Sequence, residues 1–75
     1  MKVSIYNSMS YTFEYFECDY VKIDKERILL VGSKTISILK KDKDVSEGYK
    51  HKIRNSFLEN KPLNITINKE SITIE

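Results

Sequence analysis

Ile28-Leu29-Leu30-Val31 places four apolar residues in a row near the middle of a 75-residue chain. Successive side chains of a β-strand point to opposite faces of its sheet, so Ile28 and Leu30 line one face. Leu29 and Val31 line the other. A strand that is apolar on both faces needs cover on both. This stretch therefore predicts a strand inside a sheet whose two faces are both covered.

Upstream of this strand, residues 11–23 alternate between apolar and polar side chains, as a second strand does. The alternation changes phase at Tyr15-Phe16, which predicts a β-bulge or a bend there. Residues 24–27 form a polar loop of four residues between two antiparallel strands. The length of the loop predicts two cross-strand pairs: Val21 with Leu30, and Ile23 with Ile28.

Downstream, Gly32-Ser33 is a signal for a two-residue hairpin turn, because glycine tolerates the positive φ that such turns need. This turn places Ile36 opposite Leu29, in a third strand over residues 34–40. The central hairpin then has two apolar faces. One face carries Phe16, Cys18, Tyr20, Leu29, Val31, Ile36 and Ile38. The other carries Val21, Ile23, Ile28, Leu30 and Leu39.

Residues 45–59 form the one helix that the sequence predicts. Asp44 and Glu47 have the spacing of a capping box at its start, and residues 60–62 end it. Gly48, inside this helix, is expected to cost about 1 kcal/mol relative to alanine, so the helix needs tertiary packing. Four apolar residues recur at every fourth position and form one stripe along this helix: Val45, Tyr49, Ile53 and Phe57.

Three further strands are predicted, at residues 2–6, 63–68 and 71–75. The polar loop between the last two keeps their isoleucines on one face of a hairpin. It pairs Ile67 with Ile72 and Ile65 with Ile74. The expected fold is a single α+β domain over residues 1–75. Its mostly antiparallel sheet has five or six strands, in the order β-β-β-β-α-β-β, with the helix packed on one face.

The helix can cover only one of the two apolar faces of the central hairpin. The second face is covered either by the sheet itself, curled into a small barrel or sandwich, or by another protein chain. In the second case the interface candidates are Val21, Ile23, Ile28 and Leu30. The strand at residues 71–75 also has little to guard its edge, which favours pairing between chains. We expect a protein partner or a homodimer.

Composition places the chain among globular proteins, with 40% hydrophobic and 32% charged residues. No apolar run approaches the ~20 residues of a membrane helix, and residues 1–6 lack the apolar core of a signal peptide. We therefore expect a cytoplasmic protein without membrane association. The abundance of Lys, Ile and Asn is typical of an AT-rich genome. Together with the small size, it favours an accessory protein of a bacterial mobile element or phage.

Few residues suggest catalysis. His51, the single histidine, lies opposite the apolar stripe of the helix and is expected on the surface. Cys18 shares a strand face with aromatic residues, so a buried, inert thiol is expected, and one cysteine allows no internal disulfide. Glu17 and Asp19 share a strand face, where paired carboxylates more often form a solvated side than a cation site. We predict no enzyme, no cofactor and no metal site.

The leading prediction is a small, non-catalytic protein-interaction module that acts by surface binding; a nucleic-acid-binding protein is the alternative. Residues 34–62 carry eight basic and four acidic side chains, a net charge of +4. Basic side chains on one helix face attract phosphate groups. The candidate residues are Lys40, Lys41, Lys43, Lys50 and Arg54. Aromatic side chains at Tyr11, Phe13 and Tyr15 could stack on bases, but their acidic neighbours favour packing in the core or an interface.

Overall fold

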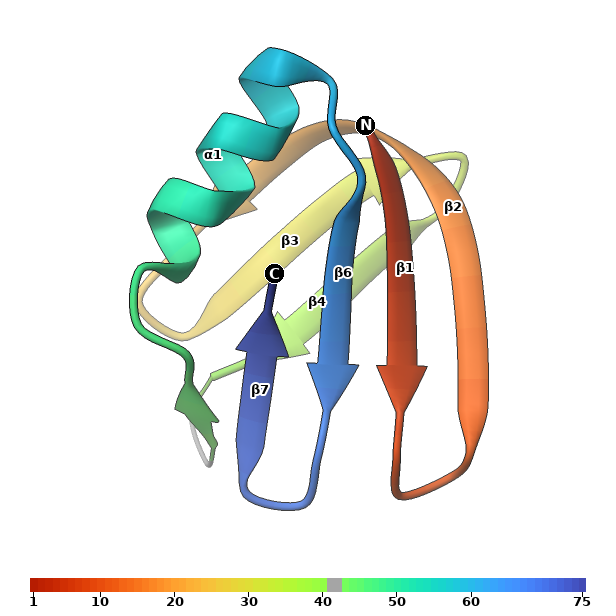
Figure 1. The fold of residues 1–75 in the computed structure, drawn as a ribbon, viewed down its shortest axis with the longest axis vertical. Coiled ribbons are helices and arrows are strands. Elements are labelled where there is room, and N and C mark those ends of the chain that lie inside the picture. Colours follow the sequence, from red (N-terminus) through yellow and green to blue (C-terminus); the bar gives the residue numbers. More distant parts are fainter. Residues whose placement is uncertain (41–42) are drawn as a thin grey trace.

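The computed structural model describes residues 1–40 and 43–75. Within these residues the chain forms seven strands and one helix (Figure 1). They are β1 Lys2–Asn7, β2 Thr12–Ile23, β3 Arg27–Gly32, β4 Thr35–Leu39, β5 Asp44–Val45, α1 Tyr49–Glu59, β6 Leu63–Ile67 and β7 Ser71–Ile74. The predicted α+β class is confirmed. The prediction of five or six strands is wrong, because β5 forms just before the helix.

The described strands form one sheet in the order β4-β3-β2-β1-β6-β7-β5. Four pairings are antiparallel, whereas β1 with β6 and β5 with β7 are parallel. The sheet is therefore mixed. The parallel pairing of β1 with β6 joins two parts of the chain that are far apart in sequence, so no loop length specifies it.

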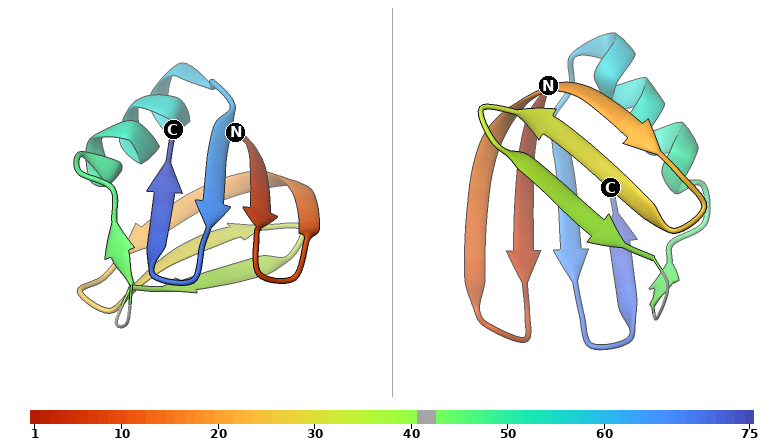
Figure 2. Two further views of the ribbon diagram at one scale, coloured as in Figure 1. Left: turned by 60° about the horizontal axis from the view of Figure 1, so that its bottom comes forward. Right: turned by 180° about the vertical axis from the view of Figure 1, so that it is seen from behind.

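The sheet curls until its two halves face each other (Figures 1 and 2). β1, β6 and β7 form one wall, β3 and β4 form the other, and β2 runs from the first wall to the second. α1 lies across the open side, next to β7 and the C-terminal half of β2. Buried apolar side chains fill the interior: Met1, Val3, Ile5, Phe16, Cys18, Ile28, Leu30, Ile38, Ile53, Leu63, Ile65, Ile72 and Ile74. Curling is thus the way in which the chain covers its central hairpin.

The turn between β3 and β4 is one residue longer than predicted, and this reverses the faces of β4. Three residues, 32–34, lie between the last paired residues of the two strands, Val31 and Thr35, and Ile36 pairs with Leu30 instead of the predicted Leu29. A shift of one residue moves every side chain of a strand to the other face of the sheet. Ile36 and Ile38 therefore join Leu30 on the inner face. The predicted division of the apolar residues between the two faces is wrong.

The apolar stretch at residues 28–31 is buried on one face only. Ile28 and Leu30 are 0% exposed, whereas Leu29 and Val31 lie half-buried on the outer face. Leu39, which was predicted to share a face with Leu30, is 64% exposed on the edge strand β4. The surplus of apolar surface from which a partner was inferred is therefore smaller than predicted.

β2 contains a bulge, as predicted, but at Cys18–Tyr20 rather than at Tyr15-Phe16. Asp19 is the extra residue, which has no partner on β3. The bulge resets the alternation of the strand, so apolar residues before and after it face the interior. The two pairs predicted from the loop at 24–27 are confirmed: Val21 with Leu30, and Ile23 with Ile28.

α1 begins at Tyr49 instead of the predicted residue 45. Asp44 and Val45 form β5, so the predicted capping box and the first residue of the predicted stripe are wrong. The N-cap is Gly48, which adopts the left-handed conformation with a φ of 71°. The predicted end is confirmed, because α1 stops at Glu59 and the N–H of Asn60 reaches carbonyl oxygens of the last turn.

The C-terminal hairpin has the predicted register, with Ile65 paired to Ile74 and Ile67 paired to Ile72. Its outer edge differs from the prediction, because β5 pairs with β7. Ser46 extends this cover: its N–H donates to the carbonyl oxygen of Ile72 (2.9 Å), and its Oγ accepts from the N–H of Ile74 (3.1 Å). The prediction of an unguarded edge at the last strand is therefore wrong.

Candidate protein-binding groove

A groove forms where β2 leaves its first neighbour. β1 pairs with residues 12–17 of β2, and β3 pairs with β2 from Cys18 onward. Beyond the bulge, the edge of β2 that had faced β1 therefore has no strand beside it among the described residues. α1 lies across this gap, anchored by Ile53, whose side chain is buried in the core.

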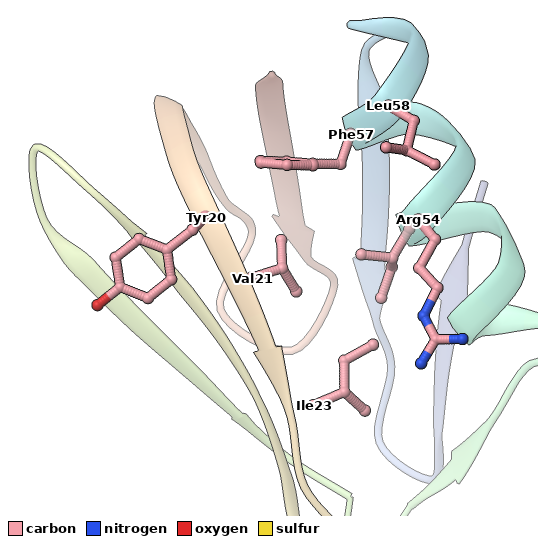
Figure 3. Close-up of a pocket in the computed structure, with 7 residues that line it drawn as sticks. Tyr20, Val21, Ile23, Arg54, Phe57 and Leu58 are labelled. Atoms are coloured by element: carbon pink, nitrogen blue, oxygen red, sulfur yellow. The ribbon is translucent and has the colours of Figure 1, made fainter.

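Between α1 and the C-terminal half of β2 lies an open cleft of about 400 Å³. Figure 3 shows Val21 and Ile23 pointing from the strand toward the helix, and Phe57 reaching from the helix toward the strand. Phe57 is 40% exposed and Leu58 is 80% exposed. We call this cleft the β2–α1 groove. It is lined by Tyr20, Val21, Ile23, Ile53, Arg54, Phe57 and Leu58.

Arg54 is the charged side chain that lines the groove. Its guanidinium group lies on the strand side of α1, beside apolar side chains (Figure 3). Over residues 1–40 and 43–75, no ion pair includes Arg54. α1 also carries Lys50, His51 and Lys52, with Glu59 as its one acidic residue. Of these residues only Arg54 lines the groove, and its positive charge favours an acidic occupant.

The structure divides the four predicted interface residues. Val21 and Ile23 are half-buried and line the β2–α1 groove. Ile28 and Leu30 are 0% exposed, so they offer no surface to another molecule in this fold. Sequence reasoning missed Leu58, because this residue lies beside the predicted apolar stripe instead of within it.

Two of the predicted basic residues are tied to neighbouring parts of the chain. Lys40 Nζ donates to the carbonyl oxygen of Asp24 and to the hydroxyl group of Tyr49. Lys43 Nζ donates to the carbonyl oxygen of Asn68, at 2.9 Å. These bonds place the two ammonium groups against different elements, so the predicted basic segment is not one continuous surface.

The remaining basic candidates are also separated. Arg54 belongs to the β2–α1 groove. Lys40 and Lys50 both lie near Tyr49, with their Nζ atoms 5.2 and 6.0 Å from the centre of its ring. Lys41 lies outside the described residues. The pair around Tyr49 is the part of the predicted set that the structure brings together.

A second exposed apolar surface lies on the outer face of β1 and β2. The ring centroids of Phe13 and Tyr15 are 4.7 Å apart in an edge-to-face arrangement, and Phe13 lies 6.4 Å from Tyr6. Tyr11, Phe13 and Tyr15 are all exposed. The prediction that these aromatic residues pack in the core is wrong. A role for them in an interface stays a prediction.

Neither Cys18 nor His51, the two residues considered for nucleophilic or acid–base chemistry, lines the β2–α1 groove. Cys18 is buried, as predicted, and its Sγ donates to the carbonyl oxygen of Tyr20 at 3.2 Å. Burial raises the pKa of the Cys18 thiol above its usual value, which keeps it in the neutral, unreactive form. His51 is exposed on α1. In the part of the chain that the structure describes, no three His, Cys, Asp or Glu side chains gather as a metal site.

Comparison with protein family models, with curated proteins and with solved structures finds no match to this chain. Across the described residues, no helix combines the length and the apolar character that are needed to cross a bilayer. Function is therefore inferred from the residues and the geometry of the molecule itself.

Proposed function

We propose that this chain is a small, non-catalytic protein-interaction module that binds a protein partner through the β2–α1 groove. The observation that carries the proposal is Leu58, which is 80% exposed at the mouth of an apolar cleft. A single exposed leucine is ordinary on a protein surface, but this one adjoins Phe57 and lines the same cleft as Val21 and Ile23. Full burial of a leucine side chain gains about 1.5–3 kcal/mol, so a partner that covers the groove gains affinity.

The composition of the groove supports binding without chemistry. Its lining consists of apolar and aromatic side chains and the guanidinium group of Arg54. A guanidinium group stays protonated at all ordinary pH values, so it holds an anion but does not act as a general base. The amino-acid composition further supports a cytoplasmic accessory protein of a bacterial mobile element or phage.

The test of the groove compares two exposed leucines. Random peptides displayed on phage are selected against the full chain, and the enriched peptides are then measured against the Leu58→Asp and Leu39→Asp variants. Leu39 is 64% exposed on β4, outside the groove, so aspartate there adds the same charge elsewhere. We expect Leu58→Asp to weaken binding by roughly tenfold or more, because aspartate cannot replace the apolar packing of leucine against the peptide. We expect Leu39→Asp to bind as the original chain does.

Circular dichroism of both variants checks that they keep the fold. Peptides that bind the Leu58→Asp variant as tightly as the original chain would show that the groove is not the binding surface. A selection that enriches no more peptide than an unrelated small protein does would contradict the interaction function itself.

Nucleic-acid binding is the second candidate function, and one observation favours it. Lys40 and Lys50 lie on the ring of Tyr49, so two positive charges and an aromatic ring share one place on the surface. Positive charges bind phosphate groups, and aromatic rings stack on bases. Against this candidate, Lys40 is already bonded to the carbonyl oxygen of Asp24.

Fluorescence anisotropy of labelled duplex and single-stranded DNA, titrated with salt, tests this second candidate. If the Tyr49 cluster and its helix face bind phosphate, Lys50→Glu combined with Arg54→Glu should abolish binding at low salt. The salt slope should fall by roughly one for each phosphate group that the variant no longer binds. Lys25→Glu combined with Lys69→Glu makes the same change of charge in exposed loops and serves as the control. Equal binding by the two double variants would exclude a role for this helix face.

A further inference from the structure

We propose that the occupant of the β2–α1 groove is an extended, acidic segment of another protein, which adds to the free edge of β2 as an extra strand. This inference rests on the proposed function, that the groove binds protein, and it names the conformation and the charge of the partner. Three features of the groove carry it: the open backbone of β2, the spacing of the apolar lining and the charge of Arg54, which forms no ion pair with another described residue.

The backbone groups of β2 alternate in direction beyond the bulge. The N–H of Asp24 donates to the carbonyl oxygen of Arg27, at 2.9 Å, so this pair is of the hydrogen-bonded kind. Hydrogen-bonded and non-hydrogen-bonded pairs alternate along an antiparallel ladder. Lys22 therefore directs its N–H and C=O groups toward β3. Val21 and Ile23 direct theirs away from β3, toward the side on which α1 and the groove lie.

This edge of β2 is open where the comparable edge of β7 is closed. β5 pairs with the edge of β7, and Ser46 bonds to it. Among the described residues, no strand pairs with Val21 or Ile23 on the side of the groove. An exposed row of backbone donors and acceptors is a template on which another chain can form a strand. The open cleft beside the edge gives such a strand access.

The apolar lining matches the side-chain spacing of a strand. A strand paired to β2 lies about 4.8 Å from it, and every second side chain of that strand points to the same face. One face of the added strand is directed at the apolar walls, which Phe57 and Leu58 supply from the helix and Val21 supplies from β2. The segment that fits therefore has apolar residues at alternate positions.

The charge of the groove favours acidic residues at the positions of the added strand that alternate with its apolar residues. Arg54 lines the groove and takes part in no ion pair of the described residues, and Lys50 lies one turn away on the same helix. Carboxylates beside a guanidinium group form charge-assisted hydrogen bonds, which are often bidentate. A lysine-rich segment of the same apolar pattern would meet repulsion instead.

A second copy of this chain fits the groove less well than a separate segment does. The groove is walled by β2 on one side and by α1 on the other, so a strand added to β2 has the helix as its other neighbour. The edge strand β4 of a second copy brings β3 with it, on the side that would meet α1. A segment without neighbouring strands has no such obstruction.

Amide hydrogen exchange, followed residue by residue with NMR, tests strand addition. The probe is the peptide Ac-Thr-Val-Asp-Val-Asp-Val-Thr-NH₂, and its counterpart carries lysine in place of aspartate. In the free chain we expect fast exchange at Val21 and Ile23 and slow exchange at Lys22, which β3 already bonds. Saturating acidic probe should slow exchange at Val21 and Ile23 by at least roughly tenfold and leave Lys22 unchanged, because only the outward amides gain partners.

Two variants test the charge. Arg54→Glu should weaken binding of the acidic probe by roughly tenfold or more, and the variant should prefer the lysine probe to the acidic one. Lys69→Glu, in the loop between β6 and β7, makes the same change of charge away from the groove and should alter neither. Methylation of the probe on alternate backbone nitrogens gives a check that leaves the protein unaltered. Methyl groups on one alternate set should abolish binding, and those on the other set should not.

The outcomes separate this inference from the proposed function. If phage-selected peptides bind through Leu58 but Val21 and Ile23 stay unprotected, strand addition is wrong and the interaction function stands. If selected peptides bind but the acidic probe binds no better than the lysine probe, the acidic class is wrong. Concentration-dependent protection of the same two amides without any peptide would identify a second copy as the occupant and overturn the proposal. If no peptide binds the chain, the proposed function is wrong as well.

Discussion

Gly32 lies where β3 passes the bulge of β2. A Cβ atom at this position would lie 1.9 Å from the carbonyl oxygen of Glu17 and 3.2 Å from the Cα of Cys18. Both are backbone atoms, so neither can rotate out of the way. The absence of a side chain at Gly32 therefore lets β3 approach β2 at the point where β2 bends away from β1.

We expect Gly32→Ala to lower the free energy of unfolding by about 3 kcal/mol or more, because the added methyl group overpacks a backbone contact. Equilibrium unfolding in urea measures this change. Ser33→Ala, at the exposed neighbouring residue of the turn, is the control and should change the stability by no more than about 0.5 kcal/mol. A Gly32→Ala chain as stable as the original would show that β3 does not approach β2 this closely.

At the scale of elements, α1 starts late because β5 competes with it. Val45 is β-branched and pairs with Ile72, extending the sheet past β7. The chain then needs a sharp change of direction into the helix, and Gly48 provides it with a positive φ. Helical periodicity alone did not reveal this, because Val45 also has the correct spacing for the helix stripe.

The position of Gly48 reverses the expected sign of a substitution. If Gly48 lay inside the helix, its replacement by alanine would raise the free energy of unfolding by about 1 kcal/mol. Because Gly48 is instead a left-handed N-cap residue with a φ of 71°, the same replacement should lower the free energy of unfolding by about 1 kcal/mol. Urea unfolding of the Gly48→Ala and Gly48→Asn chains measures these changes in stability. The asparagine variant should be destabilised less, because asparagine tolerates the left-handed conformation better. A more stable Gly48→Ala chain would mean that the helix begins before Tyr49.

The hairpins show when loop length predicts register. The loops at 24–27 and 68–71 were both predicted correctly. Both strands beside 68–71 alternate, so only one register keeps their isoleucines together, whereas at 24–27 the length of the polar loop sets the pairs. The stretch at 28–31 is apolar at every position, so either register of β4 places apolar side chains opposite each other. The turn has three residues, 32–34, instead of the predicted two, and the pattern of apolar residues does not distinguish these two turn lengths.

At the scale of the whole molecule, the curl of the sheet depends on contacts that local patterns do not encode. The strands themselves could be predicted, β3 from its continuous apolar run and the others from alternation, and only β5 among those described was missed. The pairing of β1 with β6 could not, because it joins residues such as Val3 and Leu63 across most of the chain. This pairing brings the two hairpins side by side and closes the interior.

The groove could be predicted only in part for the same reason. Val21 and Ile23 were identified as interface candidates, and Arg54 was identified as a basic candidate for a different function. The curled sheet brings these three together with Leu58, which the helix pattern did not single out. Which residues are apolar or charged follows from the sequence, but which of them meet depends on the fold.

The extra residue at Asp19 is the one position of β2 at which the chain can lose a codon without turning its neighbours. After such a deletion Tyr20 would follow Cys18 directly and still pair with Val31, and Val21 and Ile23 would keep their faces in a regular strand without the bulge. One codon gained or lost elsewhere in the strand would instead turn every side chain beyond it to the opposite face. Over evolutionary time we therefore expect the length of β2 to change at position 19 more readily than at any other.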